Sequence, residues 1–129
     1  MNVQPITDAD RARMEEKEMR RRRIQVRRAL EIRIVNRLLK LLLKDGCSVT
    51  LSYGDGDDVV IKSRKFTDFH ADIMACDQEW LRVYKNDKHI GTVFLVYGNE
   101  GHDVICDYHN SLSSYIEEVD KFIKTIMRW

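Results

Sequence analysis

The sequence predicts an α+β domain made of a long N-terminal helix, a mainly antiparallel sheet of about five strands and a C-terminal amphipathic helix. Three observations lead to this prediction. Nothing between Thr7 and Lys44 interrupts a helix. After Gly46 the apolar residues recur with a period of two, which is typical of strands, and residues 111–129 return to the helical period. The predicted order of elements is therefore α-β-β-α-β-β-β-α.

The first element is a helix of about 37 residues, which is long for a compact domain. Thr7 followed by Asp10 resembles a capping box at its start. Asp45 and Gly46 supply a stop, because glycine suits the left-handed position after the last turn.

The two halves of this helix carry different side chains. In the second half, apolar residues cover more than half of the circumference. They are Leu30, Ile32, Ile34, Val35, Leu38, Leu39, Leu41, Leu42 and Leu43. Upstream, the arc that would face the core holds Arg20, Arg23, Arg27 and Glu31 instead. We therefore expect residues 1–29 to project beyond the domain or pack on another chain, and the broad apolar arc to serve a core and a partner together.

The sheet is predicted to begin with a β-hairpin. Val49, Leu51 and Tyr53 alternate with polar residues and form its first strand. Residues 54–57 contain only Gly and Asp and form its turn, and residues 59–61 resume a strand.

A short helix and three further strands are expected next. The helix covers about residues 67–75, begins at Thr67 or Asp68 and buries Phe69. The strands are residues 79–85, 89–97 and 102–108. Residues 92–97 are apolar on both faces, which predicts that both faces of this strand are covered.

The last segment predicts an amphipathic helix that closes the domain. It starts at Ser111 or Ser114, and Ser114 with Glu117 resembles a capping box. Its apolar face consists of Leu112, Ile116, Val119, Ile123 and Ile126. The chain of 129 residues thus divides into a long basic helix, residues 1–46, and a compact domain, residues 47–129.

Charge is distributed unevenly between these two parts. Residues 1–44 carry 13 basic and 6 acidic residues, whereas residues 45–129 carry 9 basic and 15 acidic ones. Such asymmetry indicates a basic arm with its own partner, or basic and acidic parts that attract each other within or between copies.

The cysteines and the apolar runs indicate the compartment. Cys47, Cys76 and Cys106 are widely spaced and form no CxxC pair, which is typical of reduced intracellular thiols. The N-terminus lacks the pattern of a secretion signal. The longest apolar run, residues 41–43, is far shorter than the roughly 20 residues that cross a bilayer. We expect a cytoplasmic protein that does not enter a membrane.

No motif predicts catalysis, a cofactor or a metal site, so we do not expect an enzyme. The acidic residues within 55–58 fit a hairpin turn better than a calcium loop, because a strand follows them. His102 and Cys106 share one face of a strand but lie roughly 13 Å apart along it, too far to bind one zinc ion. We therefore expect Cys106 to be a small buried side chain and the histidines to lie at strand ends. Whether the fold brings a Cys or Ser nucleophile beside a base is a question that the sequence leaves open.

The candidate residues for binding a partner are mostly basic. On the long helix they are Arg20, Arg21, Arg22, Arg23, Arg27, Arg28, Arg33, Arg37, Leu39, Lys40, Leu43 and Lys44. Such arginines bind nucleic acid or an acidic protein surface, or they are only solvated. Because residues 45–129 are acidic, a protein partner is favoured, and a second copy would form a dimer through the N-terminal helix.

Trp80, Arg82 and Tyr84 complete this set. If Leu81 and Val83 face the core, these three residues line the opposite face of the sheet. Packing beneath a helix, a protein interface and stacking of nucleobases are then all open.

Short motifs between residues 47 and 118 resemble a group of small accessory proteins of tailed bacteriophages and prophages. The motifs are DGDDVVIKSRKFTDFHADI, DQEWLRVYKNDKHIG and GTVFLVYGNEGHDVICDYHNSL. The resemblance implies an accessory, non-structural role in infection, in the cytoplasm of the host cell, and it supplies no catalytic residues.

Our prediction is therefore a small accessory protein that acts by binding a host or phage macromolecule, for example as an inhibitor of a host enzyme or defence complex. The alternative is a nucleic-acid-binding module that uses the basic N-terminal helix.

Overall fold

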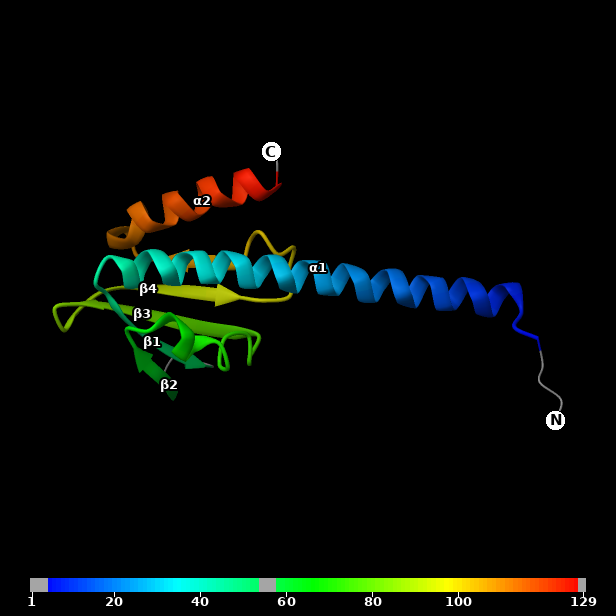
Figure 1. Cartoon of the computed structure of the whole chain (residues 1–129), viewed down its shortest axis with the longest axis horizontal. Coiled ribbons are helices and arrows are strands. Elements are labelled where there is room, and N and C mark those ends of the chain that lie inside the picture. Colours follow the sequence, from blue (N-terminus) through cyan, green and yellow to red (C-terminus); the bar gives the residue numbers. More distant parts are fainter. Residues whose placement is uncertain (1–4, 54–57, 128–129) are drawn as a thin grey trace.

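The computed structural model describes residues 5–53 and 58–127 of the chain (Figure 1). Its α-helices are α1 (Asp8–Lys44) and α2 (Ser113–Met127). Its strands are β1 (Ser48–Tyr53), β2 (Asp58–Ser63), β3 (Gln78–Lys85), β4 (Lys88–Val96) and β5 (Ile105–Tyr108). Two short 3₁₀ helices, η1 (Phe66–Phe69) and η2 (Asn110–Leu112), complete the fold. The predicted α+β fold, with a long first helix, a five-stranded sheet and a final helix, is confirmed.

The five strands form one antiparallel sheet in the order β2-β1-β3-β4-β5, with β2 and β5 at its edges. The predicted hairpin is the β1–β2 pair. Its turn, residues 54–57, lies outside the described residues. Both α-helices lie on the same face of the sheet (Figure 1).

One hydrophobic layer fills the space between the sheet and these two helices. The strands contribute Val49, Leu51, Leu81, Val83, Val93 and Leu95, all fully buried. The helices contribute Ile34, Val35, Leu38, Leu39 and Leu42 from α1, and Ile116, Val119 and Ile123 from α2. Each buried aliphatic side chain stabilises the fold by about 1.5–3 kcal/mol relative to an exposed one.

The two ends of α1 lie where the sequence predicted them. The Thr7 hydroxyl accepts a hydrogen bond from Asp10 N–H at 3.1 Å, and the Asp10 carboxylate accepts one from Thr7 N–H at 3.4 Å. After the last turn, Gly46 has a φ of +86°, in the left-handed region. The predicted capping box and helix stop are therefore confirmed.

Only the second half of α1 lies on the sheet, and the first half projects from the domain (Figure 1). We call residues 8–28 the arm; all of its side chains are exposed except that of Arg27, which is half-buried. The prediction that Glu31 lies outside the core is wrong, because this residue is fully buried. The Glu31 carboxylate accepts a hydrogen bond from Gly98 N–H at 2.8 Å and lies 3.8 Å from Arg27 Nε.

The prediction of a helix over residues 67–75 is wrong. The chain forms only η1, which follows Lys65, and then turns until β3 begins. Met74 has a φ of +66°, which an α-helix does not allow, and its N–H donates to the Glu79 carboxylate at 3.1 Å. The burial of Phe69 is as expected.

The expectation that residues 92–97 are covered on both faces is also wrong. Val93, Leu95 and Tyr97 are buried under the helices, whereas Phe94 and Val96 are only half-buried on the other face. The predicted strand 102–108 is shorter and comprises β5 alone. Cys106 on this edge strand is exposed and not the small buried side chain that the sequence suggested.

The final helix differs from the prediction only at its start. Ser114 is the second residue of α2 and cannot be the N-cap, so the predicted capping box of Ser114 and Glu117 does not form. The 3₁₀ helix η2 precedes α2 and buries Leu112. The apolar face is as predicted, with Ile126 half-buried at its end.

Candidate functional site

Within residues 5–53 and 58–127, no helix covers the face of the sheet opposite α1 and α2 (Figure 1). We call it the open face. The alternation along β3 places Trp80, Arg82 and Tyr84 there, each half-buried, because Leu81 and Val83 face the core. Packing beneath a helix was one of the possibilities left open for these three residues, and no helix within the described part of the chain packs over them.

Strand register arranges the open face in rows across the sheet. Trp80 pairs with Phe94 on β4, and Phe94 pairs with Asp107 on β5. The Trp80 and Phe94 rings are stacked, with centroids 4.2 Å apart and planes 24° apart. This pair gives the sheet a compact aromatic surface that water can reach.

The next rows contain the cations of this face. Arg82 lies across from Thr50 on β1, and Thr50 lies across from Lys62 on β2. The Lys62 Nζ is 4.6 Å from the centre of the Tyr84 ring, a cation–π contact. Thr50, although on the open face, is only 4% exposed, so larger neighbouring side chains cover it. Cations and aromatic rings thus alternate over β2, β3 and β4.

A shallow hollow of about 50 Å³ lies between the Trp80–Phe94 pair and the residues of and just after β5. It is lined by Trp80, Thr92, Phe94, Asp107, Tyr108 and His109. Within it, Thr92 N–H donates to His109 Nδ1 at 3.1 Å. Sequence reasoning missed Lys62, Phe94, Asp107 and His109. The alternation of β4 could have placed Phe94 beside Trp80, but the side chains of β2 and β5 depend on strand register.

The arm carries most of the predicted arginines, and several are paired with neighbouring acids. Arg20, Arg21 and Arg22 lie 3.9, 4.0 and 3.3 Å from the carboxylates of Glu16 or Glu18. These pairs are exposed, so each contributes little to stability. Among the described residues, Arg23 and Arg28 have no carboxylate within 4.0 Å. The segment of residues 20–28 contains no acid and presents its positive charge to solvent.

The apolar side chains of the arm do not form a seam. Met14, Met19 and Ile24 are 59, 61 and 40% exposed. Residues five positions apart are rotated by about 140° around a helix, so these three point to different sides. A coiled-coil dimer needs a continuous apolar stripe, and the arm lacks one.

The second half of α1 offers less apolar surface than predicted. Leu39 is fully buried in the core, so the prediction that it contacts a partner is wrong, and Leu43 is half-buried. The sheet, α2 and η1 together cover most of the broad apolar arc that was to serve both core and partner, and Ile32 stays 39% exposed.

The basic residues in the second half of α1 lie on the side of the helix that faces away from the sheet. Arg33 and Arg37 lie over the Phe122 ring of α2, with guanidinium carbons 5.7 and 5.6 Å from its centre. The Lys40 Nζ lies 4.8 Å from the centre of the Phe66 ring. Arg33, Arg37 and Lys40 line a groove between α1 and α2 together with Asn36. Lys44 follows in the last turn and is exposed.

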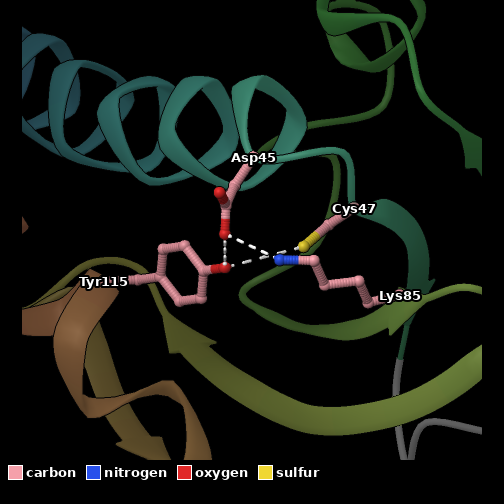
Figure 2. A network of polar contacts seen from close by, with 4 residues as sticks. All are labelled: Asp45, Cys47, Lys85 and Tyr115. Carbon is pink, nitrogen blue, oxygen red and sulfur yellow. Dashed lines mark hydrogen bonds and ion pairs between the residues drawn. The ribbon is translucent and has the colours of Figure 1, made fainter.

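Figure 2 shows a polar network at the end of α1 that joins three elements. The Tyr115 hydroxyl donates to the Asp45 carboxylate, and Lys85 Nζ lies 3.1 Å from the same oxygen. The Tyr115 bond and then Lys85 hold the pKa of Asp45 below its ordinary value. Burial and the Asp45 bond raise the pKa of Tyr115. The fully buried Cys47 Sγ is 3.8 Å from the Tyr115 hydroxyl. The network ties α1 to β3 and α2.

Two further findings concern metal binding and membrane insertion. Among the described residues, no three His, Cys, Asp or Glu side chains gather closely enough to hold a metal ion. In the same part of the chain, neither α-helix has the length and apolar character needed to cross a membrane.

Comparison of the chain with models of protein families, with characterised proteins and with solved structures gives no match. The resemblance to phage accessory proteins therefore stays a prediction.

Proposed function

We propose that this chain is a binding protein, without catalytic activity of its own, that holds single-stranded nucleic acid across the open face. The observation that carries the proposal is the stacked Trp80–Phe94 pair beside Arg82 and Lys62 on an uncovered sheet. Aromatic side chains stack nucleobases, and neighbouring cations bind the phosphates between them. Among the described side chains of these rows, Asp107 is the single acid.

The arm is placed to extend this surface. β4 runs toward the arm, and Gly98, two residues beyond the end of β4, donates its hydrogen bond to Glu31 at the base of the arm (Figure 1). The Trp80–Phe94 pair therefore lies at the end of the sheet from which the arm projects. The arginines at residues 20–23 point to all sides of the helix, which suits a flexible single strand better than a rigid duplex.

Titration of labelled single-stranded DNA and RNA across salt concentrations tests this proposal. Trp80→Ala is expected to weaken binding roughly 5- to 150-fold, because stacking of one base contributes about 1–3 kcal/mol. Arg82→Ala is expected to weaken binding and to reduce the salt slope by about 0.7, the value for one phosphate contact on a single strand.

Lys121→Ala is the matched control, since it removes one exposed cation from α2, on the helix side of the molecule. It is expected to bind like the unmodified chain. Absence of binding at low salt, or equal effects of Arg82→Ala and Lys121→Ala, would contradict the proposal.

A second function, the protein-binding accessory role, is favoured by one observation. The chain before and within the arm exposes the apolar side chains of Ile6, Met14, Met19, Ile24 and Val26, at 40–68%. A protein groove that surrounds the helix would bury them, as expected for an inhibitor of a host enzyme or defence complex. Met19→Ser with Val26→Ser should then abolish inhibition in a host-interaction assay and leave oligonucleotide binding unchanged.

A further inference from the structure

We propose that the hollow beside Phe94 is a nucleobase slot that selects guanine. This inference rests on the proposed binding of single-stranded nucleic acid and names the base that the open face prefers. It accounts for Asp107, a carboxylate in the row of Trp80 and Phe94 that would otherwise repel phosphate.

The walls of the hollow suit a planar base. Trp80 on β3 stacks on Phe94, and both rings line the hollow together with Asp107 and Tyr108 of β5. Tyr108 is 37% exposed and borders the same space at the edge of the sheet. With a volume of about 50 Å³ the hollow is shallow, so a base would insert one edge and lay its face against the rings.

The carboxylate of Asp107 is an acceptor oriented by one hydrogen bond from the backbone. Its Oδ1 accepts a hydrogen bond from Tyr108 N–H at 2.8 Å. Among the described residues, its Oδ2 has no hydrogen-bond donor, and the residue is exposed. An ionised carboxylate has two oxygens that accept hydrogen bonds, so it fits a ligand edge with two adjacent donors.

His109 lines the same hollow and its ring carries a donor. Its Nδ1 accepts the hydrogen bond from Thr92 N–H at 3.1 Å, so the proton of the neutral ring lies on Nε2. Its own backbone N–H donates to Thr92 O at 3.1 Å, which fixes the residue beside β4. The slot therefore combines two acceptors from Asp107 with one donor from His109.

Guanine is the base whose Watson–Crick edge complements this set. Its N1–H and its N2 amine are adjacent donors for the carboxylate, and its O6 accepts from an N–H group. The corresponding edges of adenine and cytosine present one donor beside an acceptor, and thymine and uracil present one donor between two acceptors. Each of these bases would place an acceptor against the Asp107 carboxylate and lose binding.

The test compares short oligothymidine strands in which every third base is guanine, hypoxanthine or adenine. The guanine strand should bind roughly 5- to 150-fold more tightly than the adenine strand, which corresponds to about 1–3 kcal/mol for one bidentate contact. Hypoxanthine lacks the N2 amine and should fall between them. Asp107→Asn should remove the preference for guanine and retain binding to plain oligothymidine.

Asp87→Asn is the matched control, because it removes the same charge at the exposed β3–β4 turn. Asp87 has a φ of +61°, which asparagine adopts readily, so the variant should fold and keep the guanine preference. Equal binding of all strands, or a guanine preference that survives Asp107→Asn, overturns the slot. Failure to bind plain oligothymidine and every other strand overturns the proposed function as well.

Discussion

Glu79 is a buried carboxylate at the centre of the domain. This residue is fully buried on β3. Its carboxylate accepts a hydrogen bond from the Tyr97 hydroxyl at 2.6 Å and another from Met74 N–H at 3.1 Å. Both bonds reach Oε1, and Oε2 has no hydrogen-bond partner within the described part of the chain. Burial raises the pKa of Glu79, and the bonds from Tyr97 and the backbone only partly oppose this. The ionised side chain therefore destabilises the fold.

The pH dependence of stability follows from that direction. Because the folded-state pKa lies above the ordinary value of 4.5, the folded chain binds more protons than the unfolded chain in this range. The stability that protonated Glu79 contributes is fully present below the ordinary pKa, and it is lost as the pH rises through the raised pKa of the folded chain. Glu79→Gln keeps the Oε1 acceptor and removes the charge. It should raise the free energy of unfolding at about pH 8 by about 1 kcal/mol and flatten its pH dependence.

Urea unfolding between about pH 4 and about pH 8 measures this effect. Glu117→Gln is the control, since Glu117 is exposed on α2 and should leave the pH dependence unchanged. An equal pH slope in Glu79→Gln and the unmodified chain would show that Glu79 is not the titrating group.

At the scale of elements, η2 packs against β4 because one strand position has no side chain. A Cβ added at Gly91 would lie 2.7 Å from Leu112 Cγ and 2.9 Å from Ser111 Oγ. Ser111 also donates a hydrogen bond from its hydroxyl to Ile90 O, so it is not free to move away. This contact seats Leu112 in the core and sets where α2 begins.

Gly91→Ala should therefore destabilise the fold by about 1–3 kcal/mol through overpacking. Leu112→Ala alone should cost about 2–5 kcal/mol, because it leaves a cavity. In the double variant the added methyl group occupies part of that cavity, so the loss should be smaller than the sum of the two. Urea unfolding of the three variants gives these values. Strict additivity would mean that the two positions do not share the same space.

At the scale of the whole molecule, the domain and the arm are stabilised by different means. The domain has a hydrophobic layer, whereas the arm has a capping box and exposed ion pairs worth a few tenths of a kcal/mol each. The contacts between them begin at Arg27, which lies beside Glu31 and Gly101. An isolated helix of the length of the arm is only marginally stable in water.

Deletion of residues 1–23 should consequently leave the domain folded, with a free energy of unfolding within about 0.5 kcal/mol of the full chain. The deletion removes Arg20 to Arg23 and retains Arg27, so that Glu31 keeps its neighbour. Affinity for single-stranded DNA should fall, and the salt slope should decrease. Circular dichroism and salt titration measure the two results. An unfolded deletion variant, or an unchanged salt slope, would contradict this division of roles.

Much of the fold was readable from local sequence patterns. Thr7, Asp10 and Gly46 predicted both ends of α1, because capping depends on residues only a few positions apart. The alternation around Trp80 and Arg82 predicted that they share a face, because a strand turns its side chains by a fixed period. These features need no knowledge of the rest of the chain.

The sequence by itself thus determined the periods, the caps and the sharing of faces, together with the uneven charge of the two halves. Tertiary structure decided which faces are covered: it buried Leu39 and Glu31, left Phe94 half-exposed, and placed Asp107 and His109 in one hollow with Phe94. The physical reason is that burial and strand register depend on contacts between residues distant in sequence, and local propensity does not specify these.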